Sequence, residues 1–197
     1  MSATRSNKLA SAPLAEVLQR CELPPGARAL VQGDGDAMSI VAKLTNSGFE
    51  IAATRVFAHA LPKREAVWWA CMCAGHTTPA EPAAADTKAR ELAELWVRQQ
   101  TDEVRRAAME EARRAGFQSP EAWAAVAAFW SAGSLAPPSA PVVPPPAHLA
   151  GIAVAGAVAL ASVRGASGRQ PQRLALFLQS AHDIAIGGPG RLQVEAS

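Results

Sequence analysis

The stretch that decides the fold is Leu61-Pro62-Lys63-Arg64-Glu65-Ala66-Val67-Trp68-Trp69-Ala70-Cys71-Met72-Cys73. A charged triplet, Lys63-Arg64-Glu65, directly precedes an uninterrupted apolar run over 66–74. Successive side chains on a helix point about 100° apart, so Trp68 and Trp69 cannot share one face. We therefore expect this segment to be a helix that is buried on more than one side, at the centre of the molecule.

The composition of the whole chain is that of a helical globular protein. Of its 197 residues, 49% are hydrophobic and 18% are charged, which is typical of a folded chain. Alanine, the strongest helix former, is abundant, and no window alternates β-branched or aromatic residues as a half-buried strand would. We predict an all-α, multi-helical single domain of about eight to ten helices around a central, tryptophan-rich helix.

Breaks in the hydrophobic pattern predict how the chain is organised. We expect a disordered N-terminus over 1–12 and a main helical domain over 13–135. The proline-rich stretch 136–146 cannot be helical and is predicted to be an extended spacer that crosses the surface. It also matches nominal P-x-x-P docking motifs, although proline runs produce such matches freely. Residues 147–188 form a C-terminal helical pair on the same domain, and 189–197 form a flexible tail.

Local signals predict several helix ends and three ion pairs. Asp36 is the expected N-cap of a helix over 37–45, and residues 78–81 have the Thr-x-x-Glu spacing of a capping box. The many charged residues over 86–114 predict either one solvent-exposed helix or two helices with a break near Thr101. Three acid-before-base pairs lie four residues apart, as in stabilising surface ion pairs: Glu94–Arg98, Asp102–Arg106 and Glu110–Arg114.

Charge and cysteine content exclude some classes of function. The net charge is +2, from 19 basic and 17 acidic residues, which does not indicate binding to nucleic acid or to an anionic membrane. Three cysteines fit no disulfide framework and indicate a reducing compartment. The N-terminal residues lack the apolar region of a signal peptide, so we expect a cytoplasmic protein.

Residues 149–163 form an unbroken run of small and aliphatic side chains. A membrane-spanning helix needs about 20 such residues, so this run favours a buried helix. Small residues recur at every fourth position, which lets a neighbouring helix approach closely. A membrane-inserting helix is the alternative interpretation.

Cysteine and histidine side chains near the tryptophans suggest a metal or nucleophile site, but their spacing argues against it. Cys71-x-Cys73-x-x-His76 resembles a metal-ligand pattern, to which His59 could add a fourth group. Residues two apart on a helix point about 200° away from each other, so the two thiols cannot bind one ion. A nucleophilic cysteine also needs a polar, partly exposed setting, which this apolar run does not provide. We predict no metal, cofactor or catalytic residue.

The remaining candidate site is the charged group Arg55, His59, Lys63, Arg64 and Glu65. Charges at the start of a buried helix can form an internal ion pair that fixes the angle between helices, or can belong to a partner-binding groove. The structural role is favoured, and the binding role stays open.

Tryptophans at helical spacing are more often part of a core than of a ligand site. We predict that Trp68, Trp69, Trp123 and Trp130 belong to the structural core.

These residues carry a resemblance to a family. Residues 15–18 with Cys21, and residues 58–71, resemble an uncharacterised bacterial family of helical proteins with an LPKRExVWWA centre. Residues 176–178 and 183–187 also look like its C-terminal half. The central motif is long and specific, and the rest of the likeness is weak.

Proteins of the family it resembles tend to belong with type VI secretion gene clusters, in which small cytoplasmic proteins act as adaptors or loading chaperones. The resemblance therefore implies such a role. It brings no catalytic residues. We therefore expect a non-enzymatic accessory protein whose partner is another protein, and the competing class is a membrane-associated protein that uses residues 149–163.

Overall fold

Helices account for all the regular secondary structure in the computed structural model, which describes residues 8–11, 13–32 and 35–196. The α-helices are α1 (Leu14–Arg20), α2 (Pro25–Leu30), α3 (Ala37–Asn46), α4 (Glu50–Ala60), α5 (Lys63–His76), α6 (Ala84–Gln99), α7 (Asp102–Arg114), α8 (Pro120–Trp130), α9 (Leu149–Val163) and α10 (Gln170–Ala185). Two short 3-10 helices span Lys8–Ser11 and Ser167–Arg169. The described residues form no strand, so the all-α prediction is confirmed.

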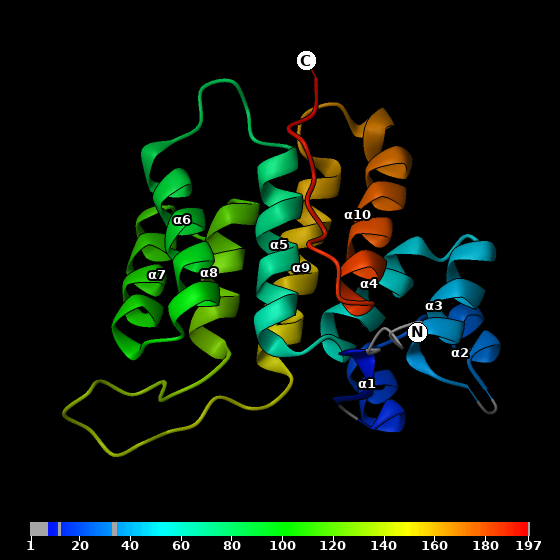
Figure 1. Cartoon of the computed structure of the whole chain (residues 1–197), viewed down its shortest axis with the longest axis horizontal. Coiled ribbons are helices and arrows are strands. Elements are labelled where there is room, and N and C mark those ends of the chain that lie inside the picture. The colour runs from blue at the N-terminus through cyan, green and yellow to red at the C-terminus, as the bar shows by residue number, and fades with distance from the viewer. Residues whose placement is uncertain (1–7, 12, 33–34, 197) are drawn as a thin grey trace, which may run out of the picture.

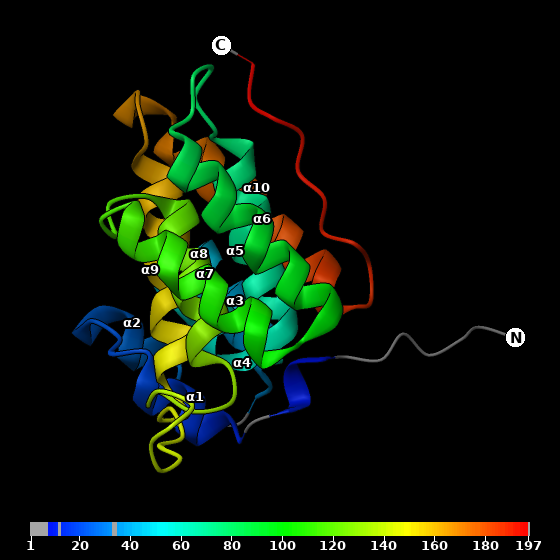
Figure 2. The ribbon, with the colours of Figure 1, turned by 90° about the vertical axis from the view of Figure 1, so that its left-hand side faces the viewer.

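Helices α5 and α9 lie side by side at the centre of one domain (Figure 1). Helices α6, α7 and α8 pack on one side of this pair, and α4 and α10 pack on the other. The view turned by 90° shows α6 and α7 as an outer layer in front of α5 and α8 (Figure 2). Helix α5 is therefore enclosed by α4, α6, α8, α9 and α10, as its apolar sequence requires.

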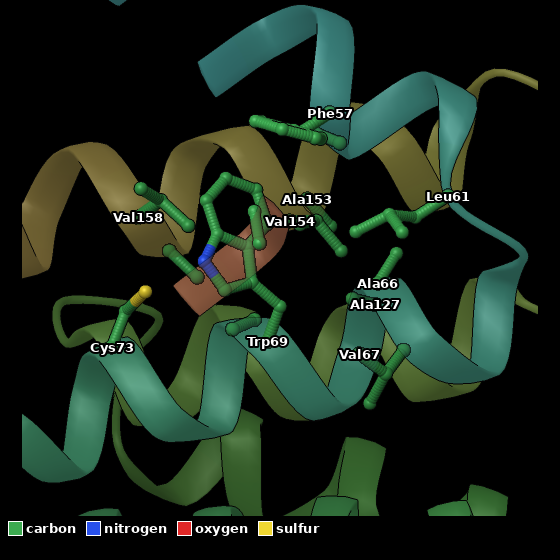
Figure 3. Close-up of a cluster of buried hydrophobic side chains, with 14 of the residues drawn as sticks. Phe57, Leu61, Ala66, Val67, Trp69, Cys73, Ala127, Ala153, Val154 and Val158 are labelled. Carbon is green, nitrogen blue, oxygen red and sulfur yellow. The ribbon is translucent and has the colours of Figure 1, made fainter. Parts of the chain in front are cut away.

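Trp69 is the largest fully buried side chain of the core. It points from α5 between α4 and α9, where its ring meets Phe57 edge to face at 6.1 Å between centroids (Figure 3). Its indole Nε1 donates a hydrogen bond to the carbonyl oxygen of Phe177 on α10, at 2.9 Å. This bond satisfies the one polar atom that burial would otherwise leave without a partner.

The other three tryptophans assigned to the core are only half-buried. Trp68 lies on a different face of α5 from Trp69 and donates to the carbonyl oxygen of Pro189. Trp123 and Trp130 pack edge to face at 6.3 Å on α8, at the margin of the core.

The small-residue helix α9 directs most of its apolar surface inward. Ala153, Val154, Ala157, Val158 and Ala161 are each fully buried against the neighbouring helices. Within the part of the chain that the structure describes, no helix combines the length and the hydrophobicity that crossing a membrane requires.

The proline-rich stretch belongs to a loop that projects from one end of the helices rather than crossing their surface (Figure 1). A hydrogen bond from the Leu135 amide to the Val143 carbonyl, at 2.8 Å, closes this loop on itself. The buried guanidinium of Arg105 fixes its base by donating to the carbonyls of Phe129 and Ser134, at 2.7 and 2.8 Å. Gly133 passes directly over that guanidinium, where a Cβ atom would lie 2.8 Å from its Nη2.

Both chain ends differ from the expected disorder where the structure describes them. Residues 8–11 form a helical turn that buries Leu9, whereas residues 1–7 and 12 lie outside the described residues. Residues 189–196 were expected to form a flexible tail. They instead lie against α5 and α10 through several hydrogen bonds, because the main chain there finds polar partners on both helices. Residue 197 lies outside the described residues.

The local helix signals have mixed outcomes. The Asp36 side chain accepts a hydrogen bond from the Ser39 amide at 2.7 Å, so the N-cap prediction is confirmed. The capping box over 78–81 is wrong as a helix start, since α6 begins only at Ala84. The charged segment is two helices, because Gln100 adopts a left-handed conformation and Thr101 caps α7.

We predict that Trp69→Ala lowers the free energy of unfolding by about 3–5 kcal/mol, because it leaves a cavity and removes the hydrogen bond to the Phe177 carbonyl. Urea unfolding followed by circular dichroism measures this loss. Trp130→Ala is the matched control at a half-buried tryptophan and should cost clearly less. Equal losses for the two variants would contradict the central role of Trp69.

Candidate functional site

The corner between α4 and α5 separates the five predicted site residues into two groups. Arg55, His59 and Lys63 line hollows together with Arg20 of α1. Arg64 and Glu65 line a different hollow, together with α6 and α10. The structure therefore does not bring the five residues into one site.

Arg55 is held by the main chain at the end of α1. Its Nη1 donates to the carbonyl oxygens of Cys21 and Glu22, at 3.4 and 3.1 Å. These carbonyls follow the last turn of α1, where the helix itself supplies no donor. The Arg55 guanidinium therefore ties α1 to α4.

His59 is half-buried and packs closely against Gly151 of α9, where a Cβ atom would lie 2.2 Å from its Nδ1. Burial, assisted by the charges of Arg20, His148 and Arg55, lowers the pKa of His59 to about 4. Burial and the nearby Arg20 also lower the pKa of Lys63. His59 is therefore neutral near pH 7.

Arg64 and Glu65 join α5 to two other segments. Arg64 Nε donates to the carbonyl oxygen of Val97 in the last turn of α6, at 2.7 Å. The Glu65 carboxylate pairs with Lys8 Nζ at 3.2 Å and lies 3.8 Å from Arg64 Nη1. Arg64 and Glu65 thus take part in ion pairing that reaches the N-terminal turn, whereas Lys63 of the charged triplet lies in the other group.

A hollow beside these residues gathers several cationic side chains. We call it the basic hollow. Its volume is about 310 Å³, and it is lined by Lys8, Arg64, Glu65, Trp68, Val97, Arg98, Ile184, Gly188 and Arg191. Four cationic side chains and one carboxylate leave an excess of three positive charges there, although the whole chain carries only +2.

Arg98 and Arg191 are the two cations of the basic hollow that have no structural task. Both are exposed, and neither guanidinium makes a hydrogen bond or ion pair to another described residue. Of the three predicted ion pairs, Asp102–Arg106 forms at 2.6 Å, and Glu110–Arg114 does not, since Arg114 pairs with Glu111. Glu94–Arg98 does not form either, since Glu94 pairs with Arg90 one turn earlier. Arg98 is therefore free to meet an anion from outside the chain.

Trp68, Val97 and Ile184 give the basic hollow an apolar lining. The Trp68 ring is half-buried, and its Nε1 is already used by the Pro189 carbonyl at 2.7 Å. Its exposed ring face can therefore contact an apolar or cationic group without losing that bond. A carboxylate flanked by an apolar group matches this combination of cations and ring.

None of the three cysteine thiols is available to react at the protein surface. Cys71 and Cys73 are fully buried on α5, and burial raises the pKa of both thiols well above the usual range. Burial likewise raises the pKa of the Cys21 thiol to about 12. Among the residues that the structure describes, no three His, Cys, Asp or Glu side chains gather as metal ligands would.

Sequence reasoning missed Lys8, Arg98 and Arg191 as members of the hollow. They come from the N-terminal turn, the end of α6 and the segment after α10, far from one another along the chain. Arg64, Glu65 and Trp68, in contrast, lie inside the motif that the sequence made conspicuous.

Comparison with known proteins gives one match. The sequence model of a family of unknown function (DUF6931) matches residues 40–185, which is most of the chain. No curated protein and no solved structure matches significantly.

We predict that all three thiols resist alkylation in the folded protein, because each is buried and protonated at pH 8. Mass spectrometry after iodoacetamide treatment should show no adduct without denaturant and three adducts in guanidinium chloride. Rapid modification of any thiol in the native protein would contradict this.

We also predict that His59 makes the folded protein less stable in mild acid. Its pKa is lower when folded than its ordinary value of 6.5, so the unfolded chain binds the proton more readily. The free energy of unfolding should therefore fall as the pH drops from about 6.5 towards 4. Urea titrations of wild type and His59→Gln across this range test the effect, because the variant should lose less stability. Parallel curves would refute it.

Proposed function

The chain belongs to the DUF6931 family, whose function is unknown, and we propose that it is a non-enzymatic accessory protein that binds another protein. In this proposal the basic hollow receives an acidic segment of the partner. The observation that carries it is the excess of three positive charges around the exposed face of Trp68.

Charge complementarity supports this assignment. Arg98 and Arg191 make no bonds to other described residues, so a partner's carboxylates need not displace an existing interaction to reach them. Clustered like charge attracts an oppositely charged partner and speeds its association, and salt weakens the attraction. The ring of Trp68 adds an apolar anchor of the kind that is common at binding hot spots.

The cellular setting extends the proposal. The LPKRExVWWA-like centre resembles a family associated with type VI secretion, and we propose an adaptor or chaperone-like role there, in the cytoplasm. The motif that carries the resemblance also contributes Arg64, Glu65 and Trp68 to the basic hollow. The membrane alternative has less support, because insertion of α9 would require Val154, Val158 and their buried neighbours to leave the core.

We predict that Arg98→Glu combined with Arg191→Glu abolishes partner capture without changing stability, since neither side chain has a partner among the described residues. The tagged protein is used to capture proteins from an extract of its own source cells, followed by quantitative mass spectrometry. Proteins that bind the hollow should fall at least tenfold with the double variant, about 1.4 kcal/mol of binding free energy.

The matched control is Lys43→Glu, which reverses an exposed charge on α3, away from the hollow. It should capture the same proteins as wild type. The proposal of a hollow-bound partner fails if every captured protein is retained by the double variant, or if none is captured. A captured set without secretion components would refute the type VI setting alone.

A further inference from the structure

Residues 188–196, which we call the C-terminal strap, run as an extended segment along α5 and α10 (Figures 1 and 2). The strap follows a turn at Gly187, whose φ of 94° is a conformation that favours glycine. It starts beside the basic hollow and ends beyond the C-terminal end of α5, near His76.

The main chain of the strap makes most of its polar contacts. Trp68 Nε1 and Ser180 Oγ donate to the carbonyls of Pro189 and Gly190, at 2.7 and 2.5 Å. The Glu195 amide donates to the carbonyl of His76 at 2.8 Å, and the His76 ring bonds the Gln193 carbonyl. Because these contacts are to main-chain atoms, they recognise an extended conformation and do not depend on which side chains the segment carries.

Two side chains of the strap contribute specificity. Leu192 is half-buried and packs against the core, whereas Gln193 and Val194 point to solvent. The Glu195 carboxylate receives Arg173 Nη2 at 2.6 Å and Nε at 3.2 Å, and it lies 3.4 Å from Arg169. The recognised pattern is therefore an apolar residue followed, three positions later, by an acidic one.

The carboxylate receptor is fixed by α9 and α10 independently of the strap. Arg173 is 5% exposed, and its Nη1 donates to the carbonyl of Ser162 at 3.3 Å and to that of Arg164. These bonds hold the guanidinium in place with Nε and Nη2 aimed at the strap. If Glu195 left, the neighbouring cations Arg173 and Arg169 would lose their shared counter-charge, so the empty groove would attract another carboxylate.

We propose that this groove is a peptide-binding site that the C-terminal strap occupies as an internal ligand. Its external ligand is an extended segment of a partner protein with the Leu-x-x-Glu pattern of residues 192–195, which displaces the strap. Because the strap is tethered, its effective concentration is high, on the order of millimolar. Free peptides therefore bind the intact protein weakly, and loosening the strap exposes the site. This inference does not depend on the basic hollow binding a partner.

The test uses the full chain and a fluorescent peptide with the sequence of residues 190–196, Gly-Arg-Leu-Gln-Val-Glu-Ala. Glu195→Lys places a positive charge against Arg173 and Arg169 and should loosen the strap. Fluorescence anisotropy should show that this variant binds the peptide at least tenfold more tightly than wild type does. Glu195→Gln, a milder change, should give a smaller gain in the same direction.

Two controls isolate the groove. Glu103→Lys makes the same charge change at an exposed position on α7 and should bind the peptide as weakly as wild type. A peptide carrying Lys in place of its Glu should bind none of the proteins, which tests the Arg173 receptor without altering it. Circular dichroism confirms that each variant is folded.

Hydrogen exchange gives a readout on the wild type that needs no variant. A saturating concentration of the peptide should expose the amide of Glu195, which the His76 carbonyl protects in the intact strap. The proposal is overturned if folded Glu195→Lys and Glu195→Gln bind no more peptide than wild type, or if the Glu195 amide stays protected. It is also overturned if light scattering shows that copies of the chain dimerise by exchanging straps, because the occupant would then be a second copy.

Discussion

The fold depends on one constraint: helix α5 must be covered by other helices on several sides. Its apolar side chains leave the helix in several directions, so no single neighbour can cover them. The protein meets this requirement with α4, α6, α8, α9 and α10, and Trp69 reaches Phe57 on one of them and the Phe177 carbonyl on another. Changing the position of any of these helices would uncover part of α5, so the order of the bundle follows from this sequence.

Close packing around α5 relies on small residues in the helices that enclose it. Helix α8 buries Ala122, Ala124, Ala125, Ala127 and Ala128, and α9 buries alanines at the same depth. Small side chains let helix axes approach, and bulky ones then fill the remaining space. Gly151 shows the limit of this approach, because a single added methyl would collide with His59. The alanine content is thus a packing requirement as well as a helix preference.

Sequence reasoning succeeded where the signal is local and failed where tertiary contacts decide. The Asp36 cap forms because its partner, Ser39, is three residues away on the same turn. The 78–81 capping box forms no helix start, since capping preferences are small compared with the packing that sets where α6 begins. The basic hollow could not be predicted either, because Lys8, Arg98 and Arg191 meet only after the bundle has formed.

Arginine side chains supply hydrogen-bond donors to segments that lie outside the helices. A helix satisfies its own main-chain groups, but an irregular segment packed against it must find donors and acceptors elsewhere. Arg105 binds the Ser134 carbonyl of the projecting loop, and Arg173 binds the strap. The half-buried Arg164 pairs with buried Glu121 and binds the Thr77 carbonyl. The guanidinium suits this task because its several donors have a fixed geometry.

Arg105 and Arg173 differ in how firmly they hold the irregular segments that they bind. Arg105 reaches two carbonyls and Asp102 from a site that is 1% exposed, and the projecting loop it holds is bounded by α8 and α9. Arg173 holds the C-terminal strap through one carboxylate that is itself 23% exposed. Arg173 binds no main-chain atom of the strap, so loss of Glu195 would break its whole attachment there, whereas Arg105 would keep the carbonyls of Phe129 and Ser134 if Asp102 were lost. Release of the strap would therefore cost its bonds to Trp68 and His76 on α5 and the packing of Leu192, but it would leave Trp69 covered by α4, α9 and α10.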